Sequence, residues 1–202
     1  MRRLLLAALL LVMAVPSVAS AQTDQANRLD VIDISGALDR QAVTFISDTI
    51  QQVAGEGSQA VIIEISSPGV VADAAHFEAL RDLIASPPLP VVMWVGPAPA
   101  VAYGGVLDLL VASQIPAAAP GAHIGLAEPT LVADRSDDTT DLPVALTESI
   151  LTVSGPVEGL VEELSPAISQ LIQDMDGAVV RLAEGPRTLS TLVPGPNGTV
   201  QP

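Results

Sequence analysis

Small residues between Gly96 and Gly125 form the stretch with the clearest potential for chemistry. Glycine and alanine cluster before a short helix predicted for 106–112, and they cluster again at 117–121. Side chains this small let backbone segments approach closely. A turn that opens a buried helix also leaves backbone N–H groups without helical partners, and such groups can hold an oxyanion. The stretch therefore predicts the floor of a cleft.

Serine hydroxyls and histidine rings are the side chains that could react there. Ser66 and Ser67 follow a predicted strand, but in such turns hydroxyl groups usually bond to the backbone, and we favour that interpretation. His123 could form an acid–base pair with Glu128 or Asp108, although a histidine that only completes its turn is the favoured alternative. The other residues considered are Ser113, Ser136, Ser149, Ser154 and His76, the last on a helix surface.

No metal or cofactor is expected. The chain has two histidines and no cysteine, which gives no metal-ligand spacing. Acidic residues at 133–142 could bind calcium loosely through Asp134, Asp137, Asp138 and Asp141. That run lacks the glycine-punctuated calcium pattern, so an exposed, solvated loop is the favoured interpretation. Trp94 and Tyr103 flank the small-residue turn, and we favour core packing for both over an aromatic lining of the cleft.

Acidic residues dominate the charge of the chain. The formal net charge is −15, and all eight basic residues are arginine. This balance argues against nucleic acid and against anionic membrane surfaces, because both attract basic patches. It identifies no partner.

Strand and helix patterns alternate along most of the chain. This alternation predicts crossover units, and hence a largely parallel sheet with helices on its faces. Helix 72–85 is expected to turn Ala75, Ala79 and Leu83 inward, with Leu80 as a further candidate. The predicted strands are 29–34, 60–65, 89–95 and 114–118; the predicted helices are 39–54, 72–85, 106–112, 144–153 and one or two within 157–175; a hairpin is predicted for 177–192.

The two ends of the chain differ from its body. Residues 1–21 combine two arginines, an apolar run and an Ala-Ser-Ala ending, which is typical of a cleaved secretory signal peptide; an uncleaved membrane anchor is the alternative. Residues 22–28 are expected to be flexible and 193–202 to be a disordered tail. The protein is therefore expected to be exported, with one domain at 29–192 and no transmembrane helix after the signal.

Three segments, in this order and spacing, resemble the N-terminal protease domain of NfeD-type membrane serine proteases. They are the turn Ser66–Gly69, the strand Pro90–Val95 with its small-residue turn, and the Ala-Pro-Gly-x-x-Ile-Gly string at Ala119–Gly125. The resemblance covers about 29–192. It implies an α/β fold of the ClpP/crotonase-like superfamily, with a largely parallel sheet, crossover helices and a C-terminal hairpin.

The resemblance also implies a serine–lysine dyad, which this chain departs from. The nucleophile position falls within Tyr103, Gly104 and Gly105, with Gly104 given by an ungapped count, and none of these is serine. The chain contains no lysine, and arginine stays protonated, so it cannot replace a neutral amine as base.

The resemblance places the oxyanion donors after the turn Pro68-Gly69. Here Val70 stands where the family has a second glycine, although its backbone N–H remains. Glu128 stands where the family has a histidine before proline.

Two classes of function follow from these residues. The first is a non-catalytic binding or assembly module, a pseudoprotease, that binds a peptide or protein partner or forms a homo-oligomer. The alternative is an active serine-type peptidase with a rebuilt site. An acyl-CoA enzyme of the wider superfamily is disfavoured, because the chain is exported and has few basic residues for the phosphates.

Overall fold

Five parallel strands form the central sheet of this structure, a computed structural model that describes residues 28–126, 150–194 and 200–201. The strands run in the order β1-β2-β3-β5-β8, and each neighbouring pair is parallel. They are β1 (Leu29–Ser35), β2 (Ala60–Ser66), β3 (Val91–Val95), β5 (Ile115–Ala118) and β8 (Glu163–Leu164). The predicted fold class, an α/β fold with a largely parallel sheet, is confirmed.

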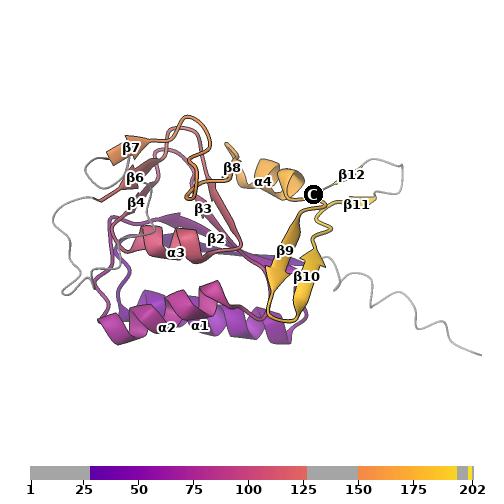
Figure 1. The fold of residues 1–202 in the computed structure, drawn as a ribbon, viewed down its shortest axis with the longest axis horizontal. Coiled ribbons are helices and arrows are strands. Elements are labelled where there is room, and N and C mark those ends of the chain that lie inside the picture. Colours follow the sequence, from indigo (N-terminus) through magenta and orange to yellow (C-terminus); the bar gives the residue numbers. More distant parts are fainter. Residues whose placement is uncertain (1–27, 127–149, 195–199, 202) are drawn as a thin grey trace, which may run out of the picture.

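Three helices cover one face of this sheet, and a fourth packs on the other (Figure 1). They are α1 (Arg40–Gly55), α2 (Ala74–Ala85) and α3 (Val106–Ala112) on the first face, and α4 (Ile168–Asp174) on the second. Asp39 caps α1 as predicted, because its carboxylate accepts from Ala42 N at 2.8 Å. Asp73 caps α2 in the same way through His76 N at 3.3 Å.

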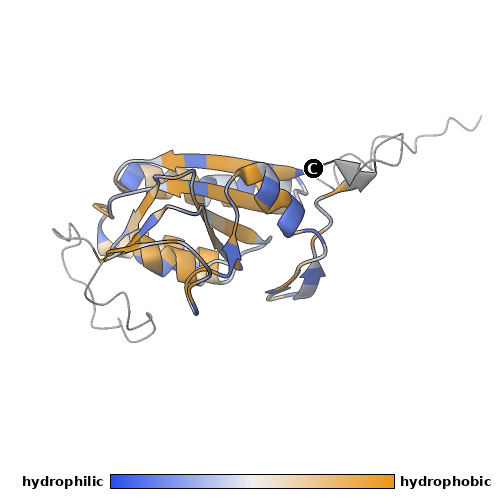
Figure 2. Ribbon diagram, turned by 90° about the horizontal axis from the view of Figure 1, so that it is seen from above, coloured by the Kyte–Doolittle hydropathy of each residue, from blue (hydrophilic) through white to orange (hydrophobic). Residues whose placement is uncertain are grey.

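Side chains on alternate positions of the strands build two apolar layers. In β2, Val61, Ile63 and Ile65 pack against the helices α1 to α3, whereas Ile62 belongs to the opposite layer with α4 and Trp94. Burial on both faces explains why the strands are apolar almost throughout. Figure 2 shows the long strands of the sheet coloured mostly as hydrophobic.

The inward face of α2 differs from the prediction. Phe77, Leu80 and Ile84 are its buried residues, while Ala75 and Ala79 are exposed. Of the residues predicted to face inward, Leu80 is buried and Leu83 packs against the core while partly exposed. The larger side chains face the sheet because they remove more apolar surface from water than alanine does.

A second, three-stranded sheet was not predicted. It consists of β4 (Val101–Tyr103), β6 (His123–Gly125) and β7 (Ile150–Thr152), with β4 parallel to β6 and β6 antiparallel to β7. The prediction of a helix over 144–153 is wrong at its end, because Ile150–Thr152 is a strand that pairs with β6.

The C-terminal region contains the predicted hairpin. Its strands β9 (Val179–Leu182) and β10 (Gly185–Thr188) pair antiparallel. Within the stretch predicted as helical, 157–175, only α4 is an α-helix, and β8 precedes it. In the tail expected to be unstructured, β11 (Val193–Pro194) and β12 (Val200–Gln201) pair antiparallel.

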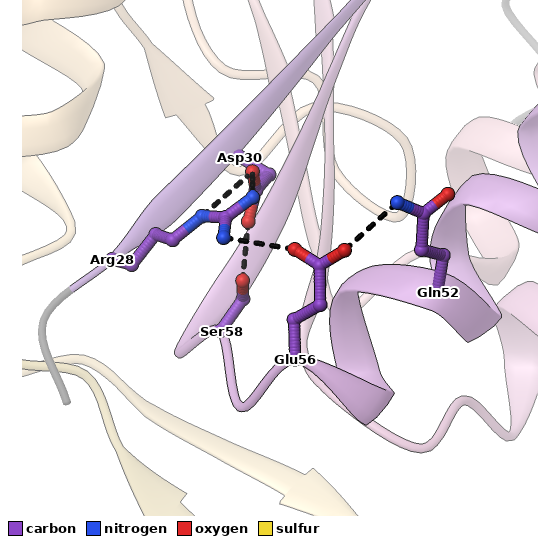
Figure 3. A network of polar contacts seen from close by, with 5 residues as sticks. All are labelled: Arg28, Asp30, Gln52, Glu56 and Ser58. Atoms are coloured by element: carbon purple, nitrogen blue, oxygen red, sulfur yellow. Dashed lines mark hydrogen bonds and ion pairs between the residues drawn. The ribbon is translucent and has the colours of Figure 1, made fainter. Parts of the chain in front are cut away.

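A charged network fixes the start of β1 to the end of α1 (Figure 3). Arg28 bonds Asp30 through Nη2 at 2.6 Å and Glu56 through Nη1 at 2.8 Å. Gln52 donates to the same glutamate at 2.8 Å, and Ser58 Oγ donates to Asp30. These side chains lie at the amino ends of β1 and β2.

Candidate functional site

The turn after β2 and the small-residue turn before α3 lie side by side. Ser67 N donates to Val101 O at 2.7 Å, and Tyr103 N donates to Ser67 O at 3.2 Å. An isolated parallel bridge pairs Ser67 with Ala102. The carboxyl end of β2 therefore continues alongside β4, over a sequence separation of more than thirty residues.

The third segment, β6, joins the same place from the other side of β4. His123 N donates to Ala100 O at 2.8 Å, and Gly104 N donates to Gly125 O at 3.0 Å. The structure thus brings together the turn with Pro68, Gly69 and Val70, the turn with Tyr103, Gly104 and Gly105, and the strand that starts at His123. Glu128 lies outside the described residues.

Gly104 occupies a sharp strand-to-helix turn. It follows β4, precedes α3, and has a left-handed φ of +58°. No described atom outside its own neighbours lies within 4 Å of a Cβ built on it, so a side chain there would point into open space. A sharp strand-to-helix turn is how α/β-hydrolases present a serine nucleophile. Gly104 has the geometry of that position without the hydroxyl.

Gly105, the next residue, is small because two side chains press against it. A Cβ at this position would lie 3.1 Å from Val70 Cγ2 and 3.2 Å from Phe77 Cζ. Both side chains are buried, with 1% of Val70 and 9% of Phe77 exposed. Val70 therefore packs directly against the start of α3.

The backbone of the turn after β2 offers one free donor. Leu38 N donates to Gly69 O at 2.9 Å, and Val71 N donates to Leu38 O at 2.9 Å. Because Leu38 bridges Val70 in a parallel ladder, the N–H of Val70 points to the opposite side. No described residue accepts from it. Gly69 N is 3.3 Å from Ser67 Oγ, and the exposed Pro68 has no N–H.

Both serines of the turn after β2 bond to backbone groups, as does Ser113 at the far end of α3, which confirms the favoured interpretation. Ser67 Oγ donates to Gly69 O at 3.0 Å, and Ser66 Oγ accepts from Val101 N at 3.3 Å. Ser113 Oγ donates to Leu110 O at 2.7 Å. Ser154 is exposed on a loop, and Ser136 and Ser149 lie outside the described residues.

The two histidines have different partners. His123 Nδ1 lies 3.1 Å from Thr152 Oγ1, across the β6–β7 register. His76 Nδ1 lies 2.7 Å from Asp73 Oδ1, and Arg40 reaches the other oxygen of that carboxylate at 2.7 Å. The hydrogen bond from His76 is the main cause that lowers the pKa of Asp73 to about 2, with the Arg40 charge contributing.

Trp94 belongs to the core, as the favoured interpretation held. Its ring is 2% exposed, and its Nε1 donates to Ser165 O at 3.0 Å. The ring lies against the backbone of Gly96, where a Cβ would approach it to 2.4 Å. Tyr103 is half-buried on β4 beside Gly104.

The described part of the chain contains neither a metal-binding cluster nor a membrane-spanning helix. No three histidine, cysteine, aspartate or glutamate side chains within it are grouped so that they could share a metal ion. None of its helices has the length and hydropathy needed to cross a bilayer. The acidic run at 133–142 lies outside the described residues.

Solved structures of one protease share this fold. No family model and no curated protein sequence matches the chain. The 1510-N membrane-bound stomatin-specific protease, solved as a variant with a substrate peptide, superposes with a TM-score of 0.65 at 20% identity, covering 85% of this chain and 94% of its own. The 1510-N protease specific for a stomatin homolog from Pyrococcus horikoshii gives 0.62 at 22% identity, covering 80% and 86%.

The chain has the fold of this protease domain. The expected resemblance to NfeD-type, ClpP-like domains is thereby confirmed for the fold. Identity near 20% does not transfer activity, so function has to be argued from the residues at the turn.

Proposed function

We propose that this chain is a non-catalytic module of protease fold, a pseudoprotease. It binds a peptide or protein segment at the carboxyl ends of the strands of its central sheet. The observation that carries the proposal is the turn at Gly104. Its backbone has the left-handed φ of +58° and the free space that a nucleophile would use, and its residue has no side chain.

The chain also has no base of the kind that a dyad needs. It contains no lysine, and a guanidinium cannot accept a proton at ordinary pH. Ser66 and Ser67, the serines nearest the turn, are engaged with the backbone. His123 faces the neutral hydroxyl of Thr152. A rebuilt nucleophile–base pair therefore finds little support among the described residues.

The backbone features that would hold a peptide are retained. The N–H of Val70 is directed away from Leu38 and has no acceptor among the described residues. Backbone donors of this kind bind the carbonyl groups of an extended peptide. The 1510-N protease, which shares the fold, has been solved with a substrate peptide. We infer that a peptide segment is also the ligand of this chain.

Export is part of the proposal. Residues 1–21 have the basic start, apolar run and small-residue ending of a secretory signal. Sequencing the amino terminus of the protein recovered outside the cytoplasm tests this. We expect it to begin at Gln22. A protein that starts at Met1 and stays with the membrane fraction would support the uncleaved anchor instead.

A serine-directed fluorophosphonate probe tests the absence of chemistry. We expect no labelling of the purified protein and no hydrolysis of apolar peptides. Labelling of one serine, lost when that serine alone is changed to alanine, would establish the alternative, an active serine-type peptidase.

A matched pair of glycine variants tests peptide binding. Gly104→Asn places a side chain in the space at the turn, and asparagine tolerates a left-handed φ. Gly57→Asn makes the same change at φ +82°, also in open space, at the end of α1. With a fluorescent apolar peptide, we expect about tenfold weaker binding for Gly104→Asn only. Equal affinities of the two variants would contradict a binding site at this turn.

A further inference from the structure

The strand β1 forms one edge of the central sheet and has a free side. Among the described residues it pairs only with β2. Gly36 N donates to Ser66 O at 3.0 Å. Because backbone groups alternate sides along a parallel strand, the even-numbered residues of β1 bond to β2 and the odd-numbered residues present their N–H and C=O groups to the free side. No described group bonds to the backbone of these odd-numbered residues, which are Leu29, Val31, Asp33 and Ser35.

An edge of this kind can pair with a further strand. The unpaired N–H and C=O groups of an edge strand accept an extended segment, which is one of the common modes of peptide recognition. The strand has seven residues in unbroken register with β2, without a bulge. Ile32 and Ile34 hold it in place, because both are buried in the core on the side of α1. The free side can therefore pair along the length of β1.

The side chains beside the free side indicate which segment fits. Asp33 lies directly across the β1–β2 register from Glu64, so the two carboxylates share one face of the sheet. Burial, and then repulsion from Asp33, raise the pKa of Glu64. Neither carboxylate has a cationic partner among the described residues. Val31 lies on the same face and is 49% exposed. This face therefore lacks a counter-charge for two adjacent carboxylates.

On the other face, α1 contributes an exposed apolar side chain. Arg40 bonds to Asp73 at the start of α2, so its flank of α1 faces α2. Phe45 comes five residues later, about 140° further around the helix. It is 53% exposed and lies on the flank away from α2. Since α2 connects β2 to β3, this flank lies toward the free side of β1.

We propose that the free side of β1 binds an extended segment of another protein that carries basic side chains at alternate positions. Alternate residues of a strand point to one face, so basic residues on one face pair with Asp33 and Glu64, and apolar residues on the other lie toward Phe45. A second copy of this chain fits less well, because antiparallel pairing of two β1 strands brings two Asp33–Glu64 pairs together. The net charge of −15 favours a cationic partner.

A fluorescein-labelled peptide of alternating lysine and valine, as long as β1, tests this proposal by fluorescence anisotropy at physiological ionic strength. The control peptide has the same sequence with N-methylated backbone amides, which keep every charge but donate no hydrogen bond. We expect the control to bind at least about tenfold more weakly, because strand addition depends on main-chain hydrogen bonds. No binding of the first peptide, or equal affinity for both, would overturn the proposal.

Variants of the edge locate the binding. Val31→Pro removes an outward N–H group, and proline is tolerated on the solvent side of an edge strand. Val31→Thr keeps the backbone and is the matched control. We expect about tenfold weaker binding for the proline variant only. Asp33→Asn combined with Glu64→Gln removes the two charges without touching the backbone, and is also expected to weaken binding about tenfold. Unchanged affinity in both the proline variant and the charge variant would contradict this site.

Amide hydrogen exchange measured by NMR reports the pairing directly. With the lysine–valine peptide bound, we expect the N–H groups of Val31, Asp33 and Ser35 to gain protection. Those of Ile32 and Ile34 already bond to β2 and should change little. Binding without this alternating pattern would refute strand addition.

Sedimentation velocity without peptide distinguishes the other occupant. A dimer of the unaltered protein that Val31→Pro abolishes would assign the free side to a second copy and overturn the proposal. Gly104→Asn is expected to leave the affinity for the lysine–valine peptide unchanged, because the free side of β1 is separate from the turn at Gly104. A loss in that variant would place this peptide at the turn instead.

Discussion

The amino ends and the carboxyl ends of the central strands are held by different kinds of contact. At the amino ends, Arg28, Asp30, Glu56 and Ser58 join β1, β2 and α1 through charged side chains (Figure 3). At the carboxyl ends of the strands, Ser67, Val101 and Gly104 are held by hydrogen bonds between backbone groups. The turn at Gly104 lies among these main-chain contacts, and its residue has no side chain. Because main-chain hydrogen bonds hold these turns in place, their backbone geometry does not depend on which side chain stands at position 104.

The largest effect on stability is expected at Gly96, which follows β3 and lies against the ring of Trp94. Gly96→Ala would place a Cβ 2.4 Å from the rigid Trp94 ring, and we expect it to lower the free energy of unfolding by about 3 kcal/mol. Urea denaturation measures this loss. Gly55→Ala, at the end of α1 with open space around its Cβ, is the control and should be neutral or slightly stabilising. Similar losses in both would refute a packing role for Gly96.

A smaller effect on stability is expected at Gly104, where open space surrounds the Cβ position. Gly104→Ser would fit the open space but force a left-handed φ on an L-residue, which costs about 1 kcal/mol. We expect the variant to fold and to show no hydrolysis, because the chain still lacks a lysine. Denaturation and a peptide-cleavage assay measure the two outcomes. Cleavage by this variant alone would mean that a base is already present.

The sequence predicts the helices and strands whose signals lie within a few neighbouring residues. The apolar runs at β2 and β3, the cap at Asp39 and the C-terminal hairpin are all where the patterns indicated. Each depends on burial, capping or turn chemistry within a few residues.

Long-range pairing could not be predicted in this way. The strands β4 and β6 have three residues each, too few for a period. They form because they pair with each other, and because Ser67 and β7 supply further backbone partners from distant parts of the chain. The order of segments indicated which turns belong to the candidate site. It could not show that Val70 packs against Gly105, because that contact joins side chains and backbone from two turns.

The next effect is a dependence of stability on pH. It is expected at Asp73, which bonds to Arg40 and His76 on the carboxyl side of the sheet. The hydrogen bond from His76 lowers the pKa of Asp73 from 3.8 to about 2. A carboxylate with a lowered pKa stabilises the fold above pH 3.8, and this contribution disappears as the pH falls toward 2. Asp73→Asn should therefore be less stable than the unaltered protein at pH 5, with the difference narrowing toward pH 2. Denaturation midpoints across this range measure it. A constant difference would assign the effect to helix capping alone.

The smallest effect is expected at Glu64, where the shift in pKa has the opposite sign. Burial, and then repulsion from Asp33 directly across the β1–β2 register, raise its pKa. A carboxyl with a raised pKa favours the folded state when protonated, so its ionisation weakens the fold as the pH rises past the unfolded value of 4.5. Glu64→Gln should stabilise the protein at pH 7 by about 0.3 kcal/mol, since the side chain is partly solvated. Asp33→Asn should give a gain of the same sign, and the double variant should gain less than the sum, because one repulsion is removed twice. Fully additive gains would show that the two carboxylates do not interact, and would leave burial as the only cause of the raised pKa.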